Sequence, residues 1–96
     1  MRLDLKEREA LKYALKDFKG KIYLFGSRLD NSKKGGDIDI LIMPDKNADT
    51  LSLSIEIEKK FFLKCEQKLD VIVYKKNNLF CKDILNNAER LAFTAI

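Results

Sequence analysis

The chain has 96 residues, of which 46% are hydrophobic, and this size predicts one domain over residues 1–96. The net charge is only +4, and no Lys/Arg block is dense enough to predict direct nucleic-acid binding. The chain contains no histidine, which excludes imidazole acid–base chemistry and His-based zinc hydrolysis. Two cysteines, a charged N-terminus and no membrane-length apolar run predict a cytoplasmic protein with buried free thiols.

An amphipathic helix is expected over about residues 4–19. Asp4 can cap its N-terminus, and Glu7 follows at the capping-box position. Gly20 supplies a stop signal. The apolar residues inside this range recur at helical spacing and are Leu11, Ala14, Leu15 and Phe18.

Two strands separated by a polar loop are expected next. Residues 21–25 form a short apolar strand, and residues 26–36 form a loop in which a helical turn could follow Ser27. Residues 37–43 form the second strand, which Pro44 ends. Residues 45–49 are a turn.

The segment 51–64 is ambiguous, because its first half alternates with period two whereas its apolar positions also fit one helical face. We predict a helix, since strands are rarely this long, and Asp49 or Thr50 could cap it. A third strand is expected over residues 69–74 and a last helix over about residues 79–88. The form of the tail Leu91-Ala92-Phe93 stays open.

This order of elements predicts the α/β (α+β) class. The expected architecture has two layers, with a small mixed sheet and the helices packed on one face of it. No internal repeat, low-complexity segment or linker interrupts the chain.

Two carboxylates stand one residue apart at the start of the second strand. Side chains on a strand alternate faces, so Asp37 and Asp39 point the same way, with Cα atoms about 6.5–7 Å apart. Ile38, Ile40 and Ile42 point into the core instead. Mg²⁺ is commonly held by one or two carboxylates together with phosphate oxygens, so this pair is a candidate metal site. An isolated pair of this kind is more often a solvated strand end.

Asp70 is a candidate third acid. It alternates with Leu69, Val71 and Val73 on the next strand, so it points away from the core. If the two strands are neighbours, the three acids share one face, where they repel one another unless cations neutralise them. Such a site favours metal-assisted phosphoryl or nucleotidyl transfer, with two metal ions about 4 Å apart and Asp70 helping to activate an acceptor hydroxyl.

The Gly26-Ser27-Arg28 turn is a candidate phosphate-binding turn. Gly26 allows backbone conformations closed to other residues, and the Ser27 hydroxyl can donate to a phosphate oxygen. Arg28, Lys33 and Lys34 are candidate positive charges beside a triphosphate. Alternatively, the turn is an ordinary one and Arg28 pairs with the acidic cluster as a structural ion.

The joint pattern of Gly26-Ser27-Arg28, Asp37-Ile38-Asp39 and Asp70 resembles the minimal nucleotidyltransferases (MNT) of the DNA polymerase β superfamily, antitoxin partners of HEPN toxins. The resemblance covers nearly the whole chain. The sequence departs from the family pattern in a loop one residue shorter, with Asn31 where a second glycine is common. Asn tolerates the left-handed conformation that this glycine would supply.

The resemblance implies an ATP- and Mg²⁺-dependent enzyme that transfers AMP to a protein acceptor, a tyrosine of a HEPN toxin. It implies Asp37, Asp39 and Asp70 as catalytic and metal-binding residues that hold two Mg²⁺ ions. It implies Gly26 and Ser27 as nucleotide-binding residues, to which Arg28 is added as a candidate.

Two other interpretations stay open at this point. The chain could neutralise a partner toxin by contact alone, with the apolar tail around Leu91 and Phe93 docking that partner or a second copy. It could instead transfer a nucleotide to a small molecule, although the chain is too short to supply a second domain for such a substrate.

Overall fold

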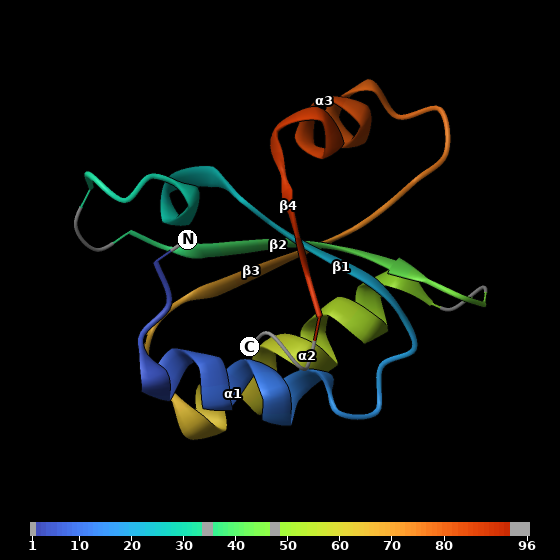
Figure 1. Ribbon diagram of the computed structural model, residues 1–96. Coiled ribbons are helices and arrows are strands. Elements are labelled where there is room, and N and C mark those ends of the chain that lie inside the picture. Colours follow the sequence, from blue (N-terminus) through green and yellow to red (C-terminus); the bar gives the residue numbers. More distant parts are fainter. Residues whose placement is uncertain (1, 34–35, 47–48, 93–96) are drawn as a thin grey trace.

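The computed structural model describes residues 2–33, 36–46 and 49–92. In chain order the elements are α1 (Leu5–Leu15), β1 (Gly20–Phe25), the 3₁₀ helix η1 (Gly26–Leu29), β2 (Ile38–Pro44), α2 (Thr50–Lys64), β3 (Leu69–Val73), α3 (Leu79–Asn87) and β4 (Glu89–Leu91). Figure 1 shows the sheet crossing the middle of the molecule, with α1 and α2 on one side and α3 on the other. The predicted α+β class is therefore confirmed.

The helix starts are set by side-chain caps. The Asp4 carboxylate accepts from the Glu7 N–H at 2.7 Å, and the Glu7 carboxylate accepts from the Asp4 N–H at 3.0 Å, which completes the predicted capping box. Asp49 caps α2 by accepting from the N–H groups of Leu51 and Ser52. The helical interpretation of residues 51–64 is thus confirmed.

The first helix ends earlier than expected, at Leu15 rather than near residue 19. The Phe18 N–H donates to the Leu15 carbonyl at 3.0 Å, which tightens the chain into a turn, and the Phe18 side chain packs against the core. Gly20, with φ +150°, then begins β1. A Cβ there would lie 2.1 Å from the Met43 carbonyl oxygen on the neighbouring strand, so the turn requires glycine.

The sheet is mixed, with strand order β3-β2-β1-β4. The β1–β2 and β1–β4 pairs are antiparallel, whereas β2 and β3 are parallel and are joined through α2. β4 was not anticipated, because its three residues give too short a pattern to predict a strand. Leu91 is only 3% exposed within it, so the expectation that Leu91 offers a free apolar docking tail is wrong, and Phe93 lies outside the described residues.

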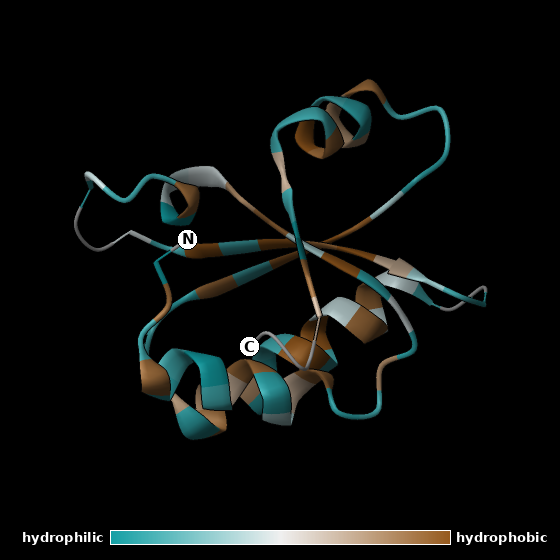
Figure 2. Ribbon diagram, viewed as in Figure 1, coloured by the Kyte–Doolittle hydropathy of each residue, from teal (hydrophilic) through white to brown (hydrophobic). Residues whose placement is uncertain are grey.

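The main core lies between the sheet and the pair α1–α2. Ile38, Ile40 and Ile42 of β2 face it, as strand alternation predicts, together with Phe61 of α2 and Leu11 of α1. Figure 2 shows many hydrophobic residues in the strands that cross the middle of the molecule. Cys65 is buried here, and Cys81 of α3 is buried in a second cluster, both as the predicted free thiols.

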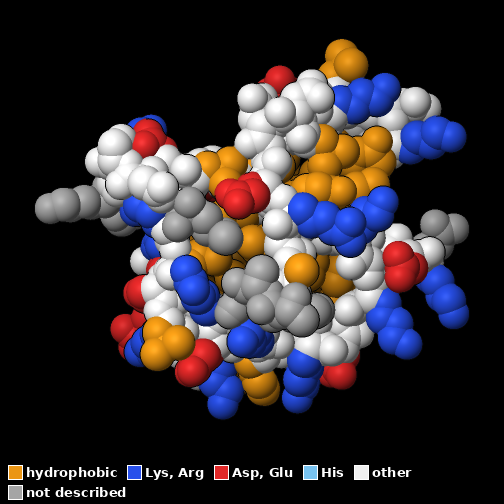
Figure 3. Space-filling model, viewed as in Figure 1, with side chains coloured by type: hydrophobic (Ala, Val, Ile, Leu, Met, Phe, Trp, Pro, Cys, Tyr) orange, Lys and Arg blue, Asp and Glu red, His pale blue; other side chains and the backbone are white. Residues whose placement is uncertain are grey.

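A second apolar cluster lies on the opposite face of the sheet and corrects the expectation that the helices share one face. Leu41 is fully buried there against Cys81 and Ile84 of α3. Tyr23 and Ile72 pack around this cluster. The reason is strand alternation, which places these apolar side chains on the acid-bearing face, where only a covering helix removes them from water. In Figure 3, apolar side chains gather between α3 and the sheet.

Candidate nucleotidyl-transfer site

The three predicted acids meet at one end of the sheet. Asp39 on β2 lies directly opposite Asp70 on β3 in the parallel register, and Asp37 immediately precedes β2. The flanking pair Ile38 and Leu69 is buried on the helix-covered face, which turns both aspartates to the other face. The sequence predicted a shared face for the three acids only if the two strands are neighbours, and in the structure β2 and β3 are neighbours.

The electrostatics of this cluster are those of crowded acids. Burial raises the pKa of the Asp39 carboxyl, and the carboxylates of Asp70 and Asp37 raise it further. Lys68 acts in the opposite direction and lowers this pKa. The Lys68 ammonium nitrogen lies 3.7 Å from Asp37 Oδ2 and 3.7 Å from Asp70 Oδ2, so one cation bridges two of the three acids.

The η1 turn lies against the same carboxylates. Gly26 has φ +78°, and a Cβ at this position would lie 2.7 Å from Asp39 Oδ2. Gly36 has φ +89°, and its Cβ would lie 2.5 Å from Ser27 Oγ. Both glycines therefore leave space that a side chain would fill, beside Asp39 and the Ser27 hydroxyl respectively. The predicted helical turn is η1, which begins at Gly26 and includes Ser27.

Arg28 is placed differently from the other predicted site residues. Its guanidinium is buried and donates to both carboxylate oxygens of Glu7 at 2.7 Å, and also to the carbonyls of Arg2 and Gly36. It therefore braces the loop that leads into β2 and does not point at the acids. The alternative of a structural ion is correct in kind, but the partner is Glu7 and not the acidic cluster.

Three further loop residues were singled out in the sequence, namely Lys33, Lys34 and Asn31. Lys33 is exposed on the loop, and Lys34 falls outside the described residues. Among described non-glycine residues only Asn77 has a positive φ, so Asn31 does not supply the left-handed conformation expected of it. Gly36 supplies one at the end of the loop instead.

Two residues of this region escaped sequence reasoning. Lys68 could have been found, because it stands two residues before Asp70 and strand alternation places both on one face. Glu7 could not, since its capping-box position predicted an exposed helix start. Its second role, the ion pair with Arg28, joins residues 21 positions apart and depends on the tertiary fold.

The residues present fit a hard divalent cation by donor type, since all three side chains offer carboxylate oxygens. Within residues 2–33, 36–46 and 49–92, however, no three carboxylates, thiols or imidazoles are gathered closely enough to form a metal-ligand group. The Lys68 ammonium forms ion pairs with Asp37 and Asp70 in this arrangement.

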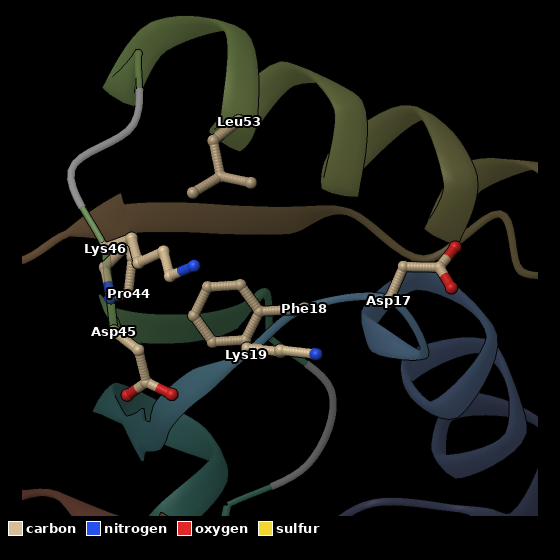
Figure 4. A pocket seen from close by; sticks show the side chains of 7 residues that line it. All are labelled: Asp17, Phe18, Lys19, Pro44, Asp45, Lys46 and Leu53. Carbon is tan, nitrogen blue, oxygen red and sulfur yellow. The ribbon is translucent and has the colours of Figure 1, made fainter.

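A surface pocket of about 380 Å³ lies elsewhere, at the far end of β2 from Asp39. Figure 4 shows the Phe18 ring facing Leu53 across this pocket, with Asp45 and Lys46 at its edge. It contains none of the predicted site residues. The described helices include none that is both long enough and apolar enough to cross a bilayer.

Comparison with known proteins identifies relatives for this fold. A family model described as "Polymerase beta, Nucleotidyltransferase" matches residues 10–94. No curated protein matches the chain. The fold is similar to that of a chain in the tri-AMPylated Shewanella oneidensis HEPN toxin in complex with MNT antitoxin, with TM-score 0.62, 22% identity, and coverage of 92% of this chain and 70% of that one.

Two further solved structures share the fold. One is of the toxin–antitoxin MntA–HepT, with TM-score 0.64, 22% identity, and coverage of 92% of this chain and 70% of that chain. The other is of a toxin–antitoxin with AMP-PNP, with TM-score 0.69, 20% identity, and coverage of 88% and 72% respectively. At these identities the likeness shows the fold.

Proposed function

The chain belongs to the polymerase beta nucleotidyltransferase family, and from this premise we propose that it transfers AMP from ATP to a protein acceptor. The acceptor we propose is a HEPN-family toxin, which makes residues 1–96 the nucleotidyltransferase domain of an antitoxin. Fold neighbours described as a tri-AMPylated HEPN toxin with its MNT antitoxin and as a toxin–antitoxin with AMP-PNP support this choice. The buried free thiols fit a reducing cytoplasm, where we place the reaction.

The observation that carries the proposal is the pairing of Asp39 with Asp70 on adjacent strands, with Gly26 packed against the Asp39 carboxylate. This arrangement brings a glycine turn and acidic side chains to one end of the sheet. A phosphate can approach backbone closely where glycine leaves room, and carboxylates can bind the cation that accompanies it.

The reaction we infer is an in-line displacement at the α-phosphorus of ATP. The acceptor hydroxyl oxygen forms a bond to this phosphorus, the bond to the bridging oxygen breaks, and pyrophosphate leaves. Asp70 accepts the hydroxyl proton, while Gly26 and Ser27 hold phosphate oxygens. Asp37, Asp39 and Asp70 would hold Mg²⁺, as two ions, and the metal would supply neutralisation of the charge on the phosphate oxygens.

The test is transfer of label from α-³²P-labelled ATP to a HEPN-family toxin co-expressed with this chain, in the presence of Mg²⁺. We expect labelled toxin with the wild-type chain and a loss of at least about 100-fold with Asp37→Asn combined with Asp39→Asn. The matched control combines Asp17→Asn with Asp45→Asn, which removes two exposed carboxylates at the far end of the sheet. Equal labelling by both double variants would refute the proposed site.

A second candidate function is neutralisation of the toxin by binding alone. The observation that favours it is a row of exposed apolar side chains along α2, made of Leu51, Ile55, Phe62 and Leu63. A shallow groove runs from Phe62 past Lys68 to Asp70, so a toxin seated on this row also lies beside the acids. An exposed apolar row of this kind is typical of a protein-docking surface.

Toxicity rescue in cells separates the two functions. If catalysis neutralises the toxin, the Asp37→Asn, Asp39→Asn variant fails to rescue growth although it still co-purifies with the toxin. If binding alone suffices, this variant rescues growth, whereas Phe62→Ser combined with Leu63→Ser does not.

A further inference from the structure

The Lys68 ammonium forms ion pairs with two of the three site carboxylates. Its nitrogen is 3.7 Å from Asp37 Oδ2 and 3.7 Å from Asp70 Oδ2. The backbone of Lys68 is fixed, because its carbonyl accepts from the Ile38 N–H at 3.1 Å. The point at which the lysine side chain is attached is thus held by the junction between β2 and β3.

The lysine side chain itself is easily moved. It is 66% exposed, whereas the Asp37 and Asp70 side chains are 47% and 42% exposed. Ion pairs this open to solvent are individually weak and can be broken at little cost. The geometry therefore combines a fixed attachment point with a side chain that can leave the site.

Three carboxylates at one end of a sheet repel one another without a cation. Within the described residues, Lys68 is the cation that forms ion pairs with two of them, and the positive charge of Arg28 is turned toward Glu7 instead. Lys68 thus offsets repulsion in the metal-free protein. A divalent ion on the same carboxylates would face the ammonium at close range.

We propose that the Lys68 ammonium is the resident counter-cation of the metal-free site and that a divalent metal must displace it to bind. This inference rests on the proposed function, since it takes the aspartates as metal ligands. It assigns Lys68 as a positioning residue that lowers metal affinity in the free chain. Lys68 holds the acids together until the metal replaces it.

The test is direct metal binding, measured from the electron paramagnetic resonance signal of free Mn²⁺ titrated with the nucleotide-free chain. Lys68→Met should bind Mn²⁺ about three- to tenfold more tightly than wild type, as expected from the loss of two partly exposed ion pairs. Lys68→Arg keeps the charge and should stay within about twofold of wild type. Lys59→Met removes an exposed lysine of α2 and controls for net charge.

The outcomes separate this inference from the proposed function. Equal or weaker Mn²⁺ binding by Lys68→Met, with wild type binding measurably, overturns the role of Lys68 and leaves the metal site intact. A gain of the same size in Lys59→Met also overturns it, because the effect would be one of net charge. Absence of Mn²⁺ binding by every variant overturns both the role of Lys68 and the proposed metal site. Mg²⁺ should compete with Mn²⁺ in each variant that binds.

Discussion

The Arg28 guanidinium points toward Glu7 of α1 rather than toward the three aspartates of the proposed site. The side chains of Arg28 and Glu7 are each 6% exposed, and they form a bidentate ion pair with both N–O distances at 2.7 Å. Arg28 also donates to the Gly36 carbonyl at 3.0 Å, so the pair fixes the end of the loop that enters β2. A buried pair of this kind is costly to break, because the remaining partner is left as an uncompensated charge.

Arg28→Met should therefore lower the free energy of unfolding by about 3–5 kcal/mol. Urea denaturation at neutral pH measures this loss. Adding Glu7→Gln to Arg28→Met should cost less than the sum of the two single changes, since both remove the same interaction. A loss below about 1 kcal/mol, with weakened ATP binding, would instead support the predicted nucleotide contact of Arg28.

Asp39 gives the pH dependence of the site. Burial and the acids around it raise its pKa in the folded protein, so the folded state binds this proton more tightly than the unfolded state. The contribution of the Asp39 carboxyl to the free energy of unfolding is fully present below the ordinary pKa of aspartate, about 3.9. It is lost as the pH rises through the raised pKa of the folded protein. At neutral pH the ionised Asp39 thus destabilises the metal-free protein.

Asp39→Asn should consequently raise the melting temperature of the metal-free protein at pH 7. The gain should shrink as the pH is lowered toward 4, because the wild-type carboxyl then becomes neutral as well. Thermal unfolding followed by circular dichroism from pH 4 to pH 7 measures both effects. Asp45→Asn, an exposed carboxylate at the far end of β2, should show no such gain, and a melting temperature of Asp39→Asn below wild type at pH 7 would contradict the prediction.

Residue positions on a strand were predictable, whereas contacts between distant segments were not. Alternation placed Asp37 and Asp39 on one face and turned Asp70 away from the core, because the period of a strand is two residues. That Asp70 lies beside Asp39 depends on the pairing of β2 with β3, which alternation does not give. Alternation could also have placed Lys68 on the face of Asp70. No local sequence pattern predicts the ion pair between Arg28 and Glu7, since it depends on how α1 packs beside η1.

At the level of elements, β3 is an edge strand whose outer side is partly covered by a side chain. The Glu58 carboxylate on α2 accepts from the Val71 N–H at 2.9 Å. This contact occupies a donor that would otherwise face outward, next to the strand that carries Asp70. Exposed edge donors invite pairing with other chains, so the contact protects this edge as well as joining α2 to β3.

Glu58→Ala should lower the free energy of unfolding by about 1 kcal/mol and speed hydrogen exchange at the Val71 amide. Glu58→Gln keeps an acceptor and should restore most of the amide protection. Glu66→Ala, which removes an exposed carboxylate just beyond the same helix, serves as the control in urea denaturation and exchange measurements. Unchanged Val71 exchange in Glu58→Ala would show that the contact does not hold the edge.

At the scale of the whole molecule, the two faces of the sheet are covered very unequally. The α1–α2 face holds the large core, whereas the α3 face holds a small cluster of Leu41, Cys81 and Ile84. Sequence patterns predicted the first layer well, because long amphipathic helices and a buried run of isoleucines mark it. They did not predict on which face of the sheet α3 packs, since the sequence of a nine-residue helix does not specify a face. The face is set by Leu41, whose apolar side chain α3 covers.

Because α3 lies on the acid-bearing face over this small cluster, it should open before the rest of the fold. We expect its amides to exchange through an opening of lower free energy than that of α1 and α2. Ile84→Ala should raise α3 exchange rates at least about tenfold while leaving α1 protection nearly unchanged, because a truncated side chain in this cluster leaves the main core intact. Ile57→Ala, at a buried position of α2, should lower protection throughout the molecule instead. Equal loss of protection in α1 and α3 from both variants would show that the two layers unfold as one unit.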